Sequence, residues 1–217
     1  MNSKILTLFL SLAALAAGAR STQAQETTID DFSTGPYNIC LRDGQVTEQK
    51  SDPIGGHIVG GVRQTVFTVG PDNRFNQPTT LHISRHRPMI IDAGLKSPWS
   101  LYLVYGVDMD GQPKPLNLSL AGSNKFRVYF DSADLTISMG MTIYSGDTNG
   151  ATQTKAVVPD PSGGQFHIDF DFSDFAPTGP NPIDWKDIDT IVVLFQAGTT
   201  TLANDFGVTS IVATNQE

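Results

Sequence analysis

The chain has 217 residues, of which 39% are hydrophobic and 17% are charged, with a formal net charge of -8 at pH 7 and one cysteine. This composition belongs to a globular protein and excludes the disordered, collagen-like, coiled-coil and disulfide-stapled classes. An acidic surface repels nucleic acid phosphates and anionic lipid headgroups, because binding them needs a cationic patch. We therefore expect no nucleic acid partner.

Residues 1–24 have the features of a secretory signal peptide. Lys4 supplies a basic start, the apolar run Ile5–Ala17 follows, and small residues lie at the cleavage point. The apolar run is shorter than the roughly 20 residues that a membrane-spanning helix needs. Cleavage also removes Lys4 and Arg20, which changes the net charge from -8 to -10. We expect the mature chain, residues 25–217, to have no transmembrane segment and to be secreted or periplasmic.

Short strands are predicted along the whole mature chain. They are marked by β-branched and aromatic residues or by alternation of apolar and polar residues, and turns rich in Gly, Asp and Pro separate them. In chain order the predicted strands are 27–32, 39–49, 62–69, 79–84, 89–92, 99–107, 116–120, 126–130, 135–143, 152–158, 166–172, 188–196 and 206–213. No segment of ten or more residues shows a helical period.

The alternation also predicts which side chains share a face. In residues 135–143 every odd position is apolar, which is typical of a half-buried strand. Trp99 shares a predicted core face with Tyr105, whereas Tyr102 points to the opposite face. The run Ile191–Phe195 has no alternation, as expected of a central strand that is covered on both sides.

These elements predict an all-β protein. About a dozen short strands joined by turns suit two antiparallel sheets packed face to face, in a jelly roll or a related sandwich. No linker, repeat or change of composition divides the chain, so we expect residues 25–217 to form a single domain.

Several blocks of sequence together resemble a group of uncharacterised exported bacterial β-sandwich proteins, often found among proteins with a C-terminal Pro-Glu-Pro sorting anchor. The blocks are Ile29–Phe32, Gly60–Arg63, Leu116–Leu118 with Phe126–Val128, Phe166–Phe175, and Asp187–Asp189 continuing from Ile191 to Phe206. The resemblance implies a galactose-binding-like jelly roll, a fold that carbohydrate-binding modules widely use. The last residues, Thr214–Glu217, lack the Pro-Glu-Pro motif, so we do not expect anchoring by that route.

The resemblance to jelly-roll modules also implies a calcium site. In related modules a structural calcium ion often joins the first and last strands, and Asp30, Asp31 and Asp205 stand in those strands here. Carboxylate oxygens are ligands that calcium prefers. Two interpretations of these three residues are open, a structural calcium site or solvated acids at the ends of the strands.

Two aromatic residues are candidates for contact with a sugar, because the apolar faces of pyranose rings stack on exposed aromatic rings. Tyr102 lies on the strand face opposite the predicted core. Trp185 follows Asn181–Asp184 in a predicted loop, where it either stacks on a ligand or caps the end of the sandwich. We expect a carbohydrate-binding protein, associated with the cell surface or matrix, that acts without catalysis.

Two other functions are open at this point. Asp169 and Asp171 share an outward strand face, about 7 Å apart along the backbone, which permits the paired carboxylates of a glycan-active hydrolase. The chain has no recognisable nucleophile or phosphate-binding motif. A structural protein-interaction module that pairs through an exposed sheet edge is the remaining alternative.

Overall fold

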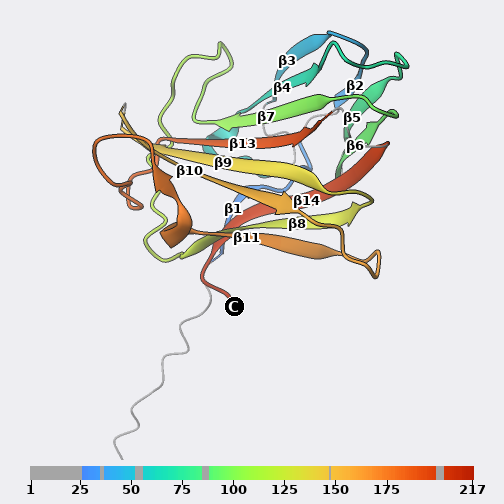
Figure 1. The fold of residues 1–217 in the computed structure, drawn as a ribbon. Helices are drawn as coiled ribbons and strands as arrows, with labels where there is room; N and C mark the ends of the chain where they lie inside the picture. The colour runs from blue at the N-terminus through green and yellow to red at the C-terminus, as the bar shows by residue number, and fades with distance from the viewer. Residues whose placement is uncertain (1–25, 35–36, 52–55, 85–87, 147, 199–202) are drawn as a thin grey trace, which may run out of the picture.

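The computed structural model describes residues 26–34, 37–51, 56–84, 88–146, 148–198 and 203–217. The predicted signal peptide, residues 1–24, lies outside the described residues. Within them, the strands form two antiparallel sheets that pack face to face, as Figure 1 shows. The predicted all-β sandwich is therefore confirmed.

The first sheet has the order β11-β8-β14-β6-β5-β2, and β1 pairs with β14 beside this path. Its strands are β1 (Glu26–Asp30), β2 (Tyr37–Leu41), β5 (Thr79–Ile83), β6 (Met89–Ala93), β8 (Lys125–Ala133), β11 (Phe166–Asp171) and β14 (Asn204–Thr214). The second sheet has the order β12-β10-β9-β13-β7-β4-β3. Its strands are β3 (Val46–Ser51), β4 (Arg63–Val69), β7 (Trp99–Tyr105), β9 (Ile137–Ser145), β10 (Asn149–Val157), β12 (Ala176–Pro177) and β13 (Thr190–Ala197).

The chain changes repeatedly from one sheet to the other, which is the connectivity of a jelly roll. Two 3₁₀ turns, η1 (Val59–Gly61) and η2 (Phe172–Asp174), are the helical segments within the described ranges. A helix with the length and hydropathy to cross a bilayer is not found in that part of the chain.

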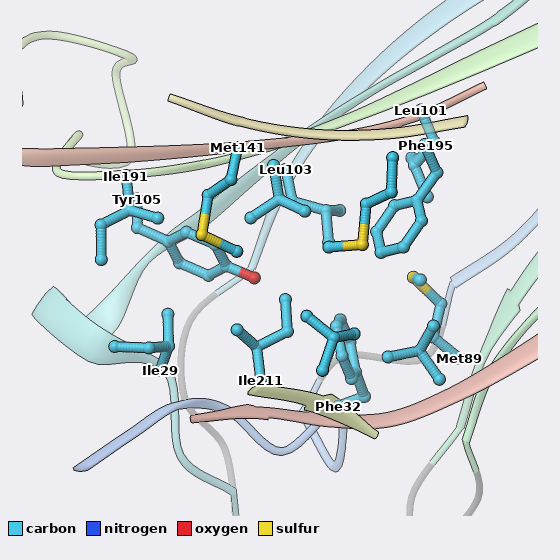
Figure 2. Close-up of a cluster of buried hydrophobic side chains, with 14 of the residues drawn as sticks. Ile29, Phe32, Met89, Leu101, Leu103, Tyr105, Met141, Ile191, Phe195 and Ile211 are labelled. Atoms are coloured by element: carbon cyan, nitrogen blue, oxygen red, sulfur yellow. The ribbon is translucent and has the colours of Figure 1, made fainter. Parts of the chain in front are cut away.

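The core lies between the two sheets and follows the predicted alternation. In β9, Met139 and Met141 are fully buried, and in β7 Trp99 and Tyr105 point inward as expected. Figure 2 shows side chains from both sheets meeting in this space, with the Tyr105 hydroxyl directed into it. Burying each large apolar side chain stabilises the fold by about 1.5–3 kcal/mol, so the alternation itself selects which face of each strand turns inward.

Two predicted strands differ from the structure. Residues 116–120 form only an isolated bridge, between Leu118 and Ile188. The reason is that Asn117 has a φ of 49°, a left-handed conformation that interrupts extended backbone. The predicted strand 39–49 is two strands, β2 and β3, because a turn with Gly44 at a φ of 68° separates them.

The unalternating run at 191–195 is confirmed as central, because β13 is the middle strand of the second sheet. The expected cover on both sides is wrong. Val192 and Leu194 point away from the core and are half-buried on the outer face of the sheet. Two aliphatic side chains therefore lie on the open side of the sandwich, where a half-exposed strand normally carries polar residues.

Candidate functional site

The outer face of β4, β7, β13 and β9 in the second sheet is the candidate site, and we call it the outer face. Cross-strand pairing arranges its side chains in rows that run across the strands. The first row is Thr68, Ser100, Gln196 and Ser138; the second is Val66, Tyr102, Leu194 and Gly140; the third is Gln64, Val104, Val192 and Thr142. A polar row thus lies beside an apolar and aromatic one.

A groove of about 440 Å³ opens along the polar row, at the end of the sheet where β7 and β9 begin. Thr68, Ser100, Ser138 and Gln196 are among the residues that line it, together with apolar residues such as Pro98, Trp99 and Ile137. The polar side chains both donate and accept hydrogen bonds. The groove therefore offers hydrogen-bonding and apolar groups side by side.

Tyr102 stands at the centre of the second row and is 39% exposed. It lies between Val66 of β4 and Leu194 of β13, one row from the groove. The predicted position of Tyr102, opposite the core residues of β7, is confirmed. An exposed ring between aliphatic neighbours, with hydrogen-bonding groups beside it, suits a ligand with both apolar and hydroxylated surfaces.

The outer face carries no formal charge on any outward side chain of β4, β7, β13 and β9, all of which the structure describes. The chain as a whole is acidic. The net charge repels anionic ligands, and the outward residues of these four strands include no cation that would attract them. A neutral ligand fits the electrostatics of the face best.

Trp185 is not part of the outer face. Its ring stacks on Phe172, with centroids 3.8 Å apart and planes 3° apart, and meets the edge of Phe175. Phe126, which is fully buried, completes this cluster with a centroid 6.3 Å from that of Trp185. The indole also lines a separate hollow of about 350 Å³. Trp185 was predicted either to stack on a ligand or to cap the end of the sandwich, and these contacts favour the cap.

Replacing Trp185 by alanine is expected to lower the free energy of unfolding by about 1–2 kcal/mol, because stacked and edge-on aromatic contacts are lost from a partly buried site. Glycan binding on the outer face should be unchanged. Chemical denaturation and affinity electrophoresis of the same preparation measure the two effects. If Trp185→Ala lost glycan binding while its stability stayed unchanged, Trp185 would belong to the ligand site instead.

Asp30 is buried between the two sheets. Its carboxylate accepts hydrogen bonds from Arg63 Nη1 at 2.6 Å, from the Tyr105 hydroxyl at 2.9 Å and from the Phe32 backbone N–H at 2.8 Å. Asp30, Arg63 and Tyr105 are all fully buried. Burial raises the pKa of Asp30 above its ordinary value, against the opposing effect of Arg63. This arrangement links β1 to β4 and β7 across the core.

The three carboxylates of the predicted calcium site do not come together. Asp30 is opposite Ile211 on β14, whereas Asp205 lies six residues earlier in that strand, roughly 20 Å away along it. Asp31 accepts hydrogen bonds from Ser33 and from the His57 backbone N–H, and these hold its pKa below the ordinary value although partial burial acts to raise it. No group of three His, Cys, Asp or Glu side chains within the described ranges is placed to hold a metal ion.

Asp205 instead faces two other carboxylates. It is the cross-strand partner of Asp92 on β6, and its backbone N–H donates to Asp134 at 2.8 Å. Its own Oδ1 accepts a hydrogen bond from the Ala93 backbone N–H at 3.2 Å. Partial burial and then the negative charge of Asp92 raise the pKa of Asp205 to about 6.

Asp205→Asn is expected to raise the melting temperature at pH 7. Because the folded pKa is raised, the native chain holds a proton that the unfolded chain releases near pH 4, so this residue's contribution to stability falls as the pH rises from about 4 to 6. Asparagine keeps the acceptor for Ala93 but not the charge. Thermal unfolding at pH 4 and pH 7 measures the effect, with Asp187→Asn on an exposed loop as the control. A lower melting temperature for Asp205→Asn at pH 7 would contradict this account.

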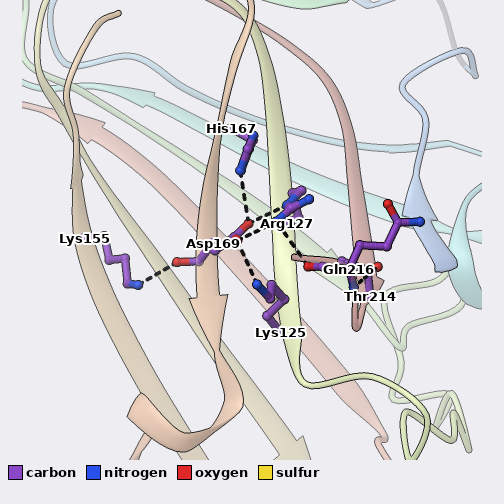
Figure 3. A network of polar contacts seen from close by, with 7 residues as sticks. All are labelled: Lys125, Arg127, Lys155, His167, Asp169, Thr214 and Gln216. Atoms are coloured by element: carbon purple, nitrogen blue, oxygen red, sulfur yellow. Dashed lines mark hydrogen bonds and ion pairs between the residues drawn. The ribbon is translucent and has the colours of Figure 1, made fainter. Parts of the chain in front are cut away.

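Asp169 belongs to a polar network on the outward side of the first sheet, which Figure 3 shows. Arg127 donates to both its carboxylate oxygens, at 2.7 and 2.8 Å, and Lys125 Nζ lies 3.2 Å from one of them. Lys155 donates to its backbone carbonyl. Partial burial acts to raise the pKa of Asp169, but the hydrogen bonds from Arg127 and Lys125 outweigh it and hold the pKa below the ordinary value.

The geometry therefore does not favour the hydrolase alternative for Asp169 and Asp171. A general acid in glycoside hydrolysis needs a raised pKa, and the pKa of Asp169 is lowered. As a nucleophile or base it would need a free carboxylate oxygen, but Arg127 and Lys125 engage both of its oxygens. Asp171 shares the same sheet face, opposite Lys125 at the end of β11. The contacts of Asp169 tie β11 to β8, which is a structural role.

No protein-family model matches this chain, and no curated protein matches it either. A solved family 11 carbohydrate-binding module of a cellulosomal cellulase from Clostridium thermocellum is 15% identical, over 87% of this chain and 94% of that one, with a TM-score of 0.41. A family 11 module of that organism, in complex with a β-1,3-1,4-mixed-linked tetrasaccharide, is 14% identical over the same shares, with a TM-score of 0.39.

An agarase is 11% identical over 70% of this chain and 22% of that one, with a TM-score of 0.41. At these identities and TM-scores, the likenesses say nothing about what this chain binds. The resemblance to exported proteins related to Pro-Glu-Pro-sorted proteins stays a prediction.

Proposed function

We propose that this chain is an exported, non-catalytic protein that binds a neutral polysaccharide on the outer face of its second sheet. The observation that carries the proposal is the exposed Tyr102 beside the groove lined by Ser100, Ser138 and Gln196. A pyranose ring has apolar faces and an equatorial rim of hydroxyl groups. Tyr102 would stack on a face while the polar row hydrogen-bonds the rim.

The apolar rows give the proposal further support. Val192 and Leu194 leave the outer face with aliphatic surface that no other described layer covers. Exposed apolar patches of this kind mark binding sites in soluble proteins. The uncharged lining of the face and the acidic charge of the whole chain favour a neutral glycan over a uronate or a sulfated one.

Affinity electrophoresis of the purified protein tests the proposal. The gels would contain hydroxyethyl cellulose, mixed-linkage β-glucan, xylan, galactomannan or agarose as neutral polysaccharides, and alginate or polygalacturonate as acidic ones. We expect retardation by at least one neutral polysaccharide and by neither acidic one. Mobility that no polysaccharide changes, with concentration-dependent oligomers in solution, would instead assign the outer face to protein contacts.

A further inference from the structure

A second tyrosine lies on the outer face, at the end of β9 far from the groove. Tyr144 points outward by the alternation of β9 and is 37% exposed. Its cross-strand partners are Thr190 of β13 and Gly150 of β10. The strand predicted from the sequence, residues 135–143, ends one position before Tyr144, so the prediction did not include this residue.

The Tyr144 ring lies over the backbone of Gly150. A Cβ atom placed on Gly150 would stand 2.5 Å from the Thr178 hydroxyl oxygen and 3.1 and 3.2 Å from Cε1 and Cδ1 of Tyr144, so the ring and Thr178 together fill the space that a side chain would take. An aromatic ring that covers a strand glycine in this way shields the backbone beneath it. More than a third of the Tyr144 side chain stays exposed, at 37%, and is accessible to a ligand.

The two tyrosines stand on a diagonal across three strands. Tyr102 is in register with Leu194 and, through it, with Gly140, and Tyr144 follows Gly140 by four residues on β9. Two steps between strands and four residues along one strand separate their backbones by roughly 17 Å. A monosaccharide is too small to touch both rings, whereas a run of several sugar units can.

Val192 of β13 lies midway along this diagonal, because its row stands between the row of Tyr102 and the row of Tyr144. Its side chain is half-buried, as are those of Val104 and Thr142 on either side of it. Gly140, which has no side chain, lies to one side of the diagonal. Nothing charged or bulky among the outward residues of β9 and β13 stands between the two rings.

We propose that Tyr144 is a second stacking platform, so that the outer face binds an internal, unbranched segment of a neutral glycan laid diagonally from Tyr102 to Tyr144. The inference rests on the proposed function and adds the length and course of the ligand. It assigns one ring to each end of the bound segment. Single sugars and disaccharides then reach only one platform.

Titration calorimetry with oligosaccharide ladders, prepared from each neutral polysaccharide of the panel and running from monosaccharide to hexasaccharide, tests this inference. For the wild type we expect affinity to rise steeply at the length that spans both rings. Tyr144→Ala should lower the affinity for the longest oligosaccharides about tenfold, as loss of one stacking contact does. The affinity for disaccharides should stay the same, and Tyr144→Trp should restore the length dependence.

Val192→Arg is a second variant, because Val192 lies midway between the two tyrosines and a long side chain there would stand in the path of the glycan. It should also weaken only the long ligands. Equal loss at every length in Tyr144→Ala, or full affinity for the longest ligand, overturns the inference. If Tyr102→Ala abolishes binding and Tyr144→Ala leaves it intact, only the second stacking platform is overturned. If the wild-type protein binds none of the oligosaccharides, the proposed function is overturned as well.

Discussion

Tyr102→Ala is expected to lower the affinity for a neutral polysaccharide about thirty- to a hundredfold, which corresponds to ~2–3 kcal/mol of binding free energy. Tyr102 stands at the centre of the outer face, between Val66 and Leu194 and one row from the groove. Central aromatic residues carry much of the binding energy at recognition sites, because they offer a large rigid surface at low entropic cost. Affinity electrophoresis in graded polysaccharide concentrations gives the dissociation constants.

Two matched variants separate stacking from other effects of the substitution. Tyr102→Phe keeps the ring and should retain most of the affinity. Tyr129→Ala removes a tyrosine on the outward side of the other sheet, where it contacts His167, and should leave binding unchanged. Because Tyr102 is 39% exposed, its removal should change the melting temperature little. Equal loss of binding in Tyr102→Ala and Tyr129→Ala would contradict the assignment of the ligand to the outer face.

The sequence predicted the faces of the strands because the physical signal is local. In β7 the alternation separates Trp99 and Tyr105, which are buried, from Tyr102, which is not. The face of a strand residue follows from its near neighbours in the sequence, and the identity of the partner strands is not needed. The same local signal correctly placed the apolar residues of β9 in the core.

The sequence shows the apolar residues of the outer face, but such a run has two interpretations, a strand covered on both sides or an apolar binding surface. An unalternating run such as Ile191–Phe195 is typical of a strand covered on both sides. Here β13 is central, yet Val192 and Leu194 lie on the open face. A run of this kind in a two-layer sandwich also indicates a binding surface, and only the layer structure decides between the two meanings. The hydrogen-bonding row with Gln196 needs the register of four strands and has no local signal.

Pairings between distant segments could not be read from the sequence. The predicted calcium set joined Asp30 to Asp205 because both stand in terminal strands, but β1 pairs with the far end of β14. The ion pair of Asp30 with Arg63 spans 33 positions, and its contact with Tyr105 spans 75. Sequence spacing carries no information about such contacts, because the packing of one sheet on the other creates them.

Asp30→Asn is expected to lower the free energy of unfolding by about 3–5 kcal/mol, since removing the anion of a buried ion pair is strongly destabilising. The introduced amide would keep an acceptor for the Phe32 N–H, but it would remove the negative charge from beside the fully buried Arg63 guanidinium, which also donates to the Thr34 carbonyl. Such a loss is a large part of the roughly 5–15 kcal/mol that stabilises a typical domain. Urea denaturation followed by tryptophan fluorescence measures it.

The loss of stability in Asp30→Asn depends on the charge of Asp30, and further variants separate the effect of that charge from the effect of a lost hydrogen bond. Tyr105→Phe removes only the hydroxyl that donates to the Asp30 carboxylate and keeps the ion pair, so it should cost about 1.5–3 kcal/mol, as for a hydrogen bond to a charged group. In the double variant Asp30→Asn with Arg63→Met the buried cation is also gone, and the combined loss should be smaller than the sum of the two single losses. Additive losses, or a cost of Asp30→Asn no larger than that of Tyr105→Phe, would show that the ion pair does not hold β1 against β4. In that case the burial of Ile29 and Phe32 beside Asp30 would be what fixes the first strand to the core.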